Sequence, residues 1–276
     1  MITNLYIKRP LLTYRSNVYM TSNKNILINP LPGTTLGIPL NIIQYVLTTA
    51  HYNENILNPE LITLQFCLGF FTYGYDRLLD AIEYNNTQDY ISENKKQLYN
   101  YLINNKNYIS LSLLLSYLYI CNQLILNDYG IEFLILLTST LFYKNIKSEF
   151  GQFKAAYIAF FWTLSCIILP CVLHDNNLDI LYDPYSYGPC FLTLFASSNL
   201  LDLKDIEEDL NNKIYTLPIA IGEKNSIIIS YMAIFLSIIL FFNNENYYNN
   251  LIPNTLFQLQ NIGSLVVPFQ LNYTIF

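Results

Sequence analysis

The sequence predicts an all-α integral membrane protein, a helical bundle that crosses the bilayer many times. Two observations of composition favour this fold class. Only 12% of the 276 residues are charged and 53% are hydrophobic, whereas soluble domains carry about 25% charged residues. The mean hydropathy is +0.27. The third observation is a series of apolar runs along the chain, which at ~20 residues per span leaves room for about eight spans with short connectors.

Eight apolar runs are candidate membrane spans. The first is rich in Pro and Gly, which membrane helices tolerate when neighbours satisfy the freed backbone groups. The third and fourth form a hairpin through the turn-like tetrapeptide at 127–130. The polar, Asn-rich run at 84–107 is predicted to form a long loop. The predicted spans are 31–50, 61–82, 109–126, 131–143, 155–173, 187–202, 226–242 and 255–276.

Basic residues predict the orientation of these spans. All 14 Lys and Arg residues fall on one side of the membrane or at its edge if the spans alternate from an inside N-terminus. The opposite connectors, 51–59, 127–130, 174–186 and 243–254, contain none. The positive-inside rule predicts this distribution, so both termini of a multi-pass protein are expected inside.

The N-terminal residues predict the domain organisation, and the net charge predicts which partners are possible. Residues 1–24 hold four basic and no acidic residues and are predicted to be a basic N-terminal segment before a transmembrane domain at 25–276. The net charge of −6 excludes nucleic acid as a partner, because no basic face could neutralise phosphates. The lipid bilayer is the expected partner. The sequence does not select an organelle, and a plastid membrane is one location that it allows.

Carboxylates gather at the inner ends of two predicted spans. Asp76 and Asp80 are four residues apart, which places them on one helical face about 5–6 Å apart at Cβ. Asp202, Asp205 and Asp209 follow at spacings of three and four, which predicts a second carboxylate stripe. Carboxylates near membrane depth are costly and tend to be functional. Two such stripes on one membrane face therefore predict a functional site.

Divalent cation binding is the chemistry that suits these stripes. Mg²⁺ takes oxygen ligands and is usually held by one or two carboxylates together with substrate phosphates. Arg77, Lys213 and Lys147 are the basic residues expected to contact a diphosphate. Metal and basic groups would stabilise charge developing on such a leaving group. The 25 Tyr and 17 Phe residues could line a dry chamber for a carbocation, and Trp162 is expected either to line this cavity or to pack.

The second acidic stripe resembles a motif of the UbiA superfamily of intramembrane prenyltransferases. The segment at 202–222, DLKDIEEDLNNKIYTLPIAIG, is similar to the family's DxxDxxxD motif with its basic residue, its T-L-P and its Gly. It is most similar to the chlorophyll synthase-like, homogentisate and archaeal lipid prenyltransferases. The resemblance implies that Asp202, Asp205 and Asp209 bind Mg²⁺–diphosphate and that Lys213 contacts phosphate.

The first stripe resembles the family's NDxxDxxxD motif in part. Thr72 and Tyr73 stand at the Asn and first Asp positions, whereas Asp76 and Asp80 match. The segment YKNIK at 143–147 is similar to the family's Y…K segment and nominates Lys147. The resemblance covers about residues 30–245 in order and spacing.

The resemblance implies both a fold and a reaction. The fold is an α-helical membrane bundle of about 8–9 transmembrane helices with a central cavity. The reaction is transfer of a polyprenyl group from its diphosphate to a small lipophilic acceptor, an aromatic ring or an alcohol, with release of pyrophosphate. Three other readings stay open: a terpene cyclase of the same fold, a non-catalytic scaffold that has lost part of the first motif, and a transporter. A transporter is disfavoured because its charges should lie at mid-span.

Overall fold

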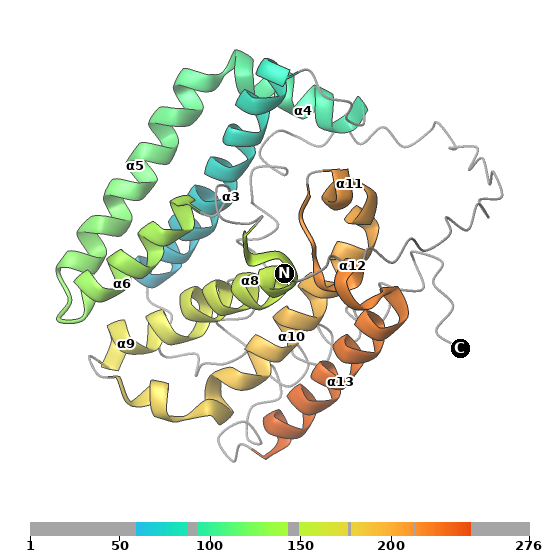
Figure 1. Ribbon diagram of the computed structural model, residues 1–276. Helices are drawn as coiled ribbons and strands as arrows, with labels where there is room; N and C mark the ends of the chain where they lie inside the picture. Colours follow the sequence, from blue (N-terminus) through green and yellow to red (C-terminus); the bar gives the residue numbers. More distant parts are fainter. Residues whose placement is uncertain (1–58, 88–92, 143–148, 176–177, 212, 244–276) are drawn as a thin grey trace, which may run out of the picture. The chain divides into compact units, whose positions relative to one another are not determined.

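The structure, a computed structural model, describes residues 59–87, 93–142, 149–175, 178–211 and 213–243. All of them belong to the second of the two units into which the chain divides, Leu31–Phe276. The described residues form helices and no β-strand, which confirms the predicted all-α class for this part of the chain (Figure 1). The predicted spans at 31–50 and 255–276, the basic segment at 1–24 and Lys147 lie outside the described residues.

The first three described helices pack together. Helix α3 (Pro59–Thr87) covers the predicted span at 61–82 and extends it at both ends. Helix α4 (Glu93–Asn104) follows, and α5 (Lys106–Ile125) corresponds to the predicted span at 109–126. Helix α3 contacts both α4 and α5, as Figure 1 shows. These contacts bring the end of α3 that carries Asp76 and Asp80 next to α4 and the start of α5.

The prediction of a loop at 84–107 is wrong for most of this run, because the end of α3, all of α4 and the start of α5 occupy it. Helix α4 is polar overall, but Tyr99 and Leu102, three residues apart, are buried against Leu78 and Ala81 of α3. A narrow apolar stripe of this kind is enough to dock a helix while its other faces stay polar. Because the run is polar on average, its two apolar residues at helical spacing do not stand out in the sequence.

A tight turn joins α5 to α6 (Gly130–Thr138), as the sequence predicted. The amide of Asn127 donates to the Leu124 carbonyl over 3.0 Å, and the amide of Gly130 donates to the Asn127 carbonyl over 3.0 Å. Glycine is required at the second of these positions, because a Cβ on Gly130 would lie 1.4 Å from the Leu124 carbonyl oxygen. The 3-10 turn η2 (Ser139–Phe142) extends α6 by one turn.

Replacing Gly130 by alanine is therefore expected to lower the thermal midpoint of the protein in detergent. The added methyl group meets a rigid backbone carbonyl, so the turn must open, at a cost of about 1–3 kcal/mol. Gly74→Ala is the matched control, because its Cβ would meet the flexible end of Leu113, at 2.8 Å, rather than backbone. Equal midpoints for the two variants would contradict this account of the turn.

The predicted span at 155–173 is a helix with an irregular centre. The 3-10 turn η3 (Gly151–Phe153) leads into α8 (Lys154–Thr163), then a π-helical turn η4 (Leu164–Ile168), then α9 (Leu169–Asp175). The buried side chain of Gln65 on α3 donates to the Ser165 carbonyl of the π-turn over 2.6 Å. This hydrogen bond ties the π-turn to α3.

Helix α10 (Pro184–Asp202) follows the 3-10 turn η5 (Asp179–Tyr182) and lies between two partners. It packs along α8 and along α13 (Glu223–Phe242), as seen in Figure 1. Its contact with α13 is partly polar. The fully buried Asn199 amide donates to the Oγ atoms of Ser226 at 2.8 Å and Ser230 at 2.7 Å. Hydrogen bonds of this kind hold helices together where the surroundings are as apolar as the side chains.

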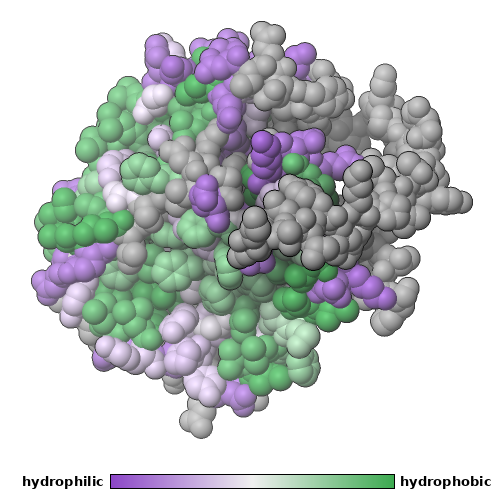
Figure 2. All heavy atoms as spheres, in the orientation of Figure 1, coloured by the Kyte–Doolittle hydropathy of each residue, from purple (hydrophilic) through white to green (hydrophobic). Residues whose placement is uncertain are grey.

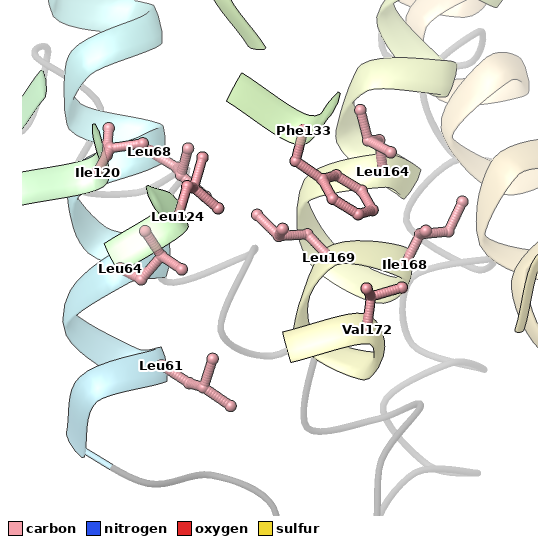
Figure 3. Packing of buried hydrophobic residues seen from close by; sticks show 10 residues of the cluster. All are labelled: Leu61, Leu64, Leu68, Ile120, Leu124, Phe133, Leu164, Ile168, Leu169 and Val172. Atoms are coloured by element: carbon pink, nitrogen blue, oxygen red, sulfur yellow. The ribbon is translucent and has the colours of Figure 1, made fainter. Parts of the chain in front are cut away.

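The largest apolar core joins α3 and α5 to α6 and to the π-turn with α9. Figure 3 shows α3 and α5 contributing side chains that face those of the other elements. Leu124 and Leu169 are completely buried in it. Its members are Leu61, Leu64, Leu68, Ile120, Leu124, Phe133, Leu164, Ile168, Leu169 and Val172.

Three described helices are long and apolar enough to cross a membrane: Lys106–Ile125, Gly151–Leu173 and Glu223–Phe242. Many of their large apolar side chains are exposed, among them Leu115 at 59% on α5 and Met232 and Phe235, both at 65%, on α13. Figure 2 shows broad apolar areas on one face of the molecule. Exposed apolar surface on this scale is typical of a surface that contacts lipid or a partner, so the described helices fit a lipid environment.

Candidate functional site

The first predicted stripe lies near the C-terminal end of α3. Arg77 separates the two aspartates in sequence, and its Nη1 lies 3.4 Å from Oδ2 of Asp80. The Asp80 side chain is 19% exposed and that of Arg77 is 36% exposed. Asp76 and Arg77 both line a pocket, whereas Asp80 lies one turn further along the helix and is not part of the lining. The first stripe thus offers one carboxylate and one guanidinium group to the pocket.

The pocket has a volume of about 210 Å³. One wall is the polar face of α3 and the opposite wall is the aromatic face of α8, with one residue from η2 between them. This volume is below the range usual for drug-sized ligands, so it would hold only part of a polyprenyl diphosphate. The lining residues are Thr72, Tyr73, Tyr75, Asp76, Arg77, Leu79, Leu141, Tyr157, Ile158, Phe161 and Trp162.

Ring contacts organise the aromatic wall. Tyr73 meets Trp162 edge-on with ring centroids 6.1 Å apart, and Tyr157 contacts Phe161 at 4.5 Å. Trp162 therefore lines the cavity, which is one of the two roles expected of it, and packs against α3 at the same time. Thr72 and Tyr73, which stand where the family motif has Asn and Asp, lie in this lining too. The faces of these rings could stabilise positive charge in the pocket.

The second predicted stripe is not one continuous α-helix. Helix α10 ends at Asp202, the 3-10 turn η6 (Leu203–Asp205) follows, and α11 (Ile206–Asn211) carries Asp209. Asp202 and Asp209 are buried, at 5% and 6% exposure, whereas Asp205 is partly exposed. The structure thus brings the first and last aspartates of the motif together and leaves the middle one outside.

Lys154, the first residue of α8, joins the two buried aspartates. Its Nζ lies 2.8 Å from Oδ1 of Asp202 and 3.4 Å from Oδ2 of Asp209. Oδ2 of Asp202 is buried and has no hydrogen-bond partner. The cluster of Lys154, Asp202 and Asp209, here termed the Lys154 cluster, is therefore buried and carries a net charge of −1 when all three groups are ionised.

Lys154 is one of the 14 basic residues expected on the inner side, but the sequence motifs do not predict it as a site residue. A signal for it exists in the sequence. Tyr157, Ile158 and Phe161 follow it by three, four and seven residues, so they share one face of α8. All three of those residues line the pocket. Helix α8 therefore carries Lys154 at its start and the aromatic wall along its next two turns.

Lys213 lies just after the end of α11 and forms no ion pair with either of the two buried aspartates. Its φ of 58° is the left-handed conformation that often closes a helix. The next amide, of Ile214, donates to the Asp209 carbonyl over 2.8 Å. The Lys213 side chain is exposed, and it forms no ion pair with another described residue. Beyond it, Thr216 precedes the short helix α12 (Leu217–Ile221), which contains the Pro of the T-L-P sequence.

The residues of the Lys154 cluster fit a divalent cation in their chemistry. Within the described residues, no group of three or more His, Cys, Asp or Glu side chains could hold a metal ion. Mg²⁺ does not need three, because one or two carboxylates suffice when phosphate oxygens complete its shell. Asp202 and Asp209 supply two carboxylates, and Oδ2 of Asp202 is an unused acceptor. In this arrangement the Lys154 ammonium group is the cation that pairs with both carboxylates.

No family model, curated protein or solved structure matches this chain.

Proposed function

We propose that the chain is a Mg²⁺-dependent intramembrane prenyltransferase of the UbiA type, built as a bundle of about 8–9 transmembrane helices. It would move a polyprenyl group from its diphosphate to a small aromatic or alcohol acceptor and release pyrophosphate. The observation that carries the proposal is the arrangement on α8. At the start of α8, Lys154 pairs with two buried aspartates. Further along α8, the aromatic face of the helix forms a pocket with Asp76 and Arg77 of α3.

In this proposal Arg77 binds the diphosphate, and the aromatic wall surrounds the allylic group. The Arg77 guanidinium can donate to diphosphate oxygens, and guanidinium groups suit planar, bidentate contacts of this kind. The rings of Tyr73, Tyr157 and Trp162 line the pocket, exclude water, and can stabilise an allylic cation as the C–O bond to the diphosphate breaks. The leaving pyrophosphate keeps the electron pair of that bond. The acceptor then supplies the electrons for the new bond to carbon and gives up its ring or hydroxyl proton to the pyrophosphate or to water.

The acidic residues would hold the metal. Asp202 and Asp209 are the described residues best placed to do so, with Asp76, Asp80 and Asp205 as the further predicted ligands. When bound, Mg²⁺ supplies neutralisation of the negative charge that develops on the leaving group. Lys154 would hold a phosphate oxygen once it no longer pairs with the aspartates.

Release of pyrophosphate tests the proposal. The purified chain in detergent is incubated with farnesyl or geranylgeranyl diphosphate, with and without Mg²⁺ and with membrane extract as a source of acceptor. We expect release that requires Mg²⁺ and falls by about 100-fold or more in Asp76→Ala and in Asp205→Ala, because each variant removes a carboxylate proposed to hold the Mg²⁺ that stabilises charge on the leaving group. Glu60→Ala is the matched control, since Glu60 is exposed at the opposite end of α3.

The absence of release from any chain length would favour the non-catalytic alternative. One observation supports that alternative: Lys154 already balances part of the charge on Asp202 and Asp209 without a metal. Release of pyrophosphate without a prenylated acceptor, together with a cyclic hydrocarbon product, would instead identify a terpene cyclase. Retention of activity in Asp76→Ala would contradict both enzyme proposals.

A further inference from the structure

We infer that Lys154 and a divalent cation compete for the same two carboxylates, so that the lysine is a built-in counter-ion that must leave before the cation binds. The inference deepens the proposed function, and it rests on that function for the identity of the cation and for the diphosphate that receives the freed lysine. The geometry of the Lys154 cluster carries it.

The three side chains are buried together. Those of Lys154, Asp202 and Asp209 are 14%, 7% and 8% exposed. A single ammonium group lies within ion-pair distance of both carboxylates, at 2.8 and 3.4 Å. Two buried carboxylates without that ammonium group would be costly, because isolated buried charges lose their hydration and gain nothing in return. Lys154 therefore makes the cluster tolerable when no metal is present.

The cluster is nevertheless incompletely satisfied. The two carboxylates share the single ammonium group of Lys154, and Oδ2 of Asp202 has no hydrogen-bond partner. A divalent cation would neutralise both carboxylates and could use the spare oxygen, whereas the lysine does neither. The site therefore has capacity for a cation of higher charge than the group that fills it.

Lys154 is suited to move. Its ammonium group is a point charge on a flexible four-carbon stem, which can change partner without a change in the backbone. It is the first residue of α8, one turn before the pocket-lining Tyr157 and Ile158. A lysine released from the aspartates could therefore reach an anion at the neighbouring end of the pocket. The exchange would couple cation binding to the appearance of a free ammonium group.

Metal binding in the absence of substrate tests the inference. The full chain in detergent is titrated with Mn²⁺, and free Mn²⁺ is followed by its electron paramagnetic resonance signal. We expect Lys154→Gln to bind Mn²⁺ about tenfold more tightly than the unmodified chain, because the competing charge is gone. The matched control is Lys204→Gln, since Lys204 is exposed on η6 and next to Asp205. The control removes the same charge nearby and should leave the affinity unchanged.

A second variant keeps the test decisive if Lys154→Gln does not fold. Lys154→Arg keeps the positive charge and can bind carboxylate in a bidentate manner, so it should weaken Mn²⁺ binding relative to the unmodified chain. Unchanged or weaker binding in folded Lys154→Gln, or unchanged binding in Lys154→Arg, would overturn the inference. This assay contains no diphosphate. A chain that shows competition but releases no pyrophosphate would leave the inference standing and refute the proposed reaction.

Discussion

Lys154→Met is expected to destabilise the folded protein by about 3–5 kcal/mol, the cost usual for removing one partner of a buried ion pair. The reason is the charge that remains. Without the ammonium group, the two buried carboxylates of Asp202 and Asp209 lose the counter-ion that they share. Methionine keeps most of the side-chain volume, so packing changes little. The thermal midpoint in detergent without divalent cations measures the loss.

Two controls separate charge from shape in this experiment. Lys154→Arg keeps the charge at the same position and should lose far less stability than Lys154→Met. Asp205→Ala changes a partly exposed member of the same motif and should shift the midpoint little, even though it is expected to abolish pyrophosphate release. A Lys154→Met variant as stable as the unmodified chain would show that the ion pairs of the Lys154 cluster do not form.

Leu124→Ala is expected to produce the other large loss, about 2–5 kcal/mol. Leu124 is completely buried at the C-terminal end of α5, where it packs into the core between α3, α6 and α9. Truncation leaves a cavity that neither water nor detergent can fill easily. Lipid tails are as apolar as leucine, so the loss would come mainly from missing packing contacts. The midpoint of thermal unfolding in detergent is again the measurement.

Leu118→Ala on the same helix is the matched control. Leu118 is 53% exposed and is expected to face lipid or detergent, so its truncation should change the midpoint by much less. The comparison also tests which side of α5 faces the bilayer. Similar losses for both variants would indicate that Leu118 is buried against another part of the protein.

The helical part of the fold could be predicted where apolar runs are long and uninterrupted. Helices α5 and α13 and the stretch from Gly151 to Leu173 coincide with predicted spans, and they are the three described helices long and apolar enough to cross a membrane. Helix α4 could not be found from mean polarity, because Tyr99 and Leu102 are the only buried residues among those of its side chains that the structure describes. The number of spans stays a prediction, since the outermost candidates lie outside the described residues.

The candidate site could be predicted as a set of residues but not as an arrangement. Spacing alone placed Asp202, Asp205 and Asp209 on one stripe, but a 3-10 turn interrupts the helix between them. Only the outer two therefore meet at Lys154. Lys154 is distant from both in sequence, and nothing in the motif points to it. Helical spacing relates Lys154 to the pocket-lining residues of α8, but its pairing with the two aspartates becomes visible only when the packing of α8 against α10 is known.

The π-turn at Leu164–Ile168 changes which face of the helix the residues after it occupy. A turn with i→i+5 hydrogen bonds holds more than 3.6 residues, so residues before and after it cannot be assigned to faces with a single period. Phe161 and Trp162 point to the pocket, while Leu169 and Val172 enter the leucine-rich core. One continuous apolar segment can thereby present a ligand-facing side and a packing side in succession, and a helical wheel drawn through all of it would merge the two.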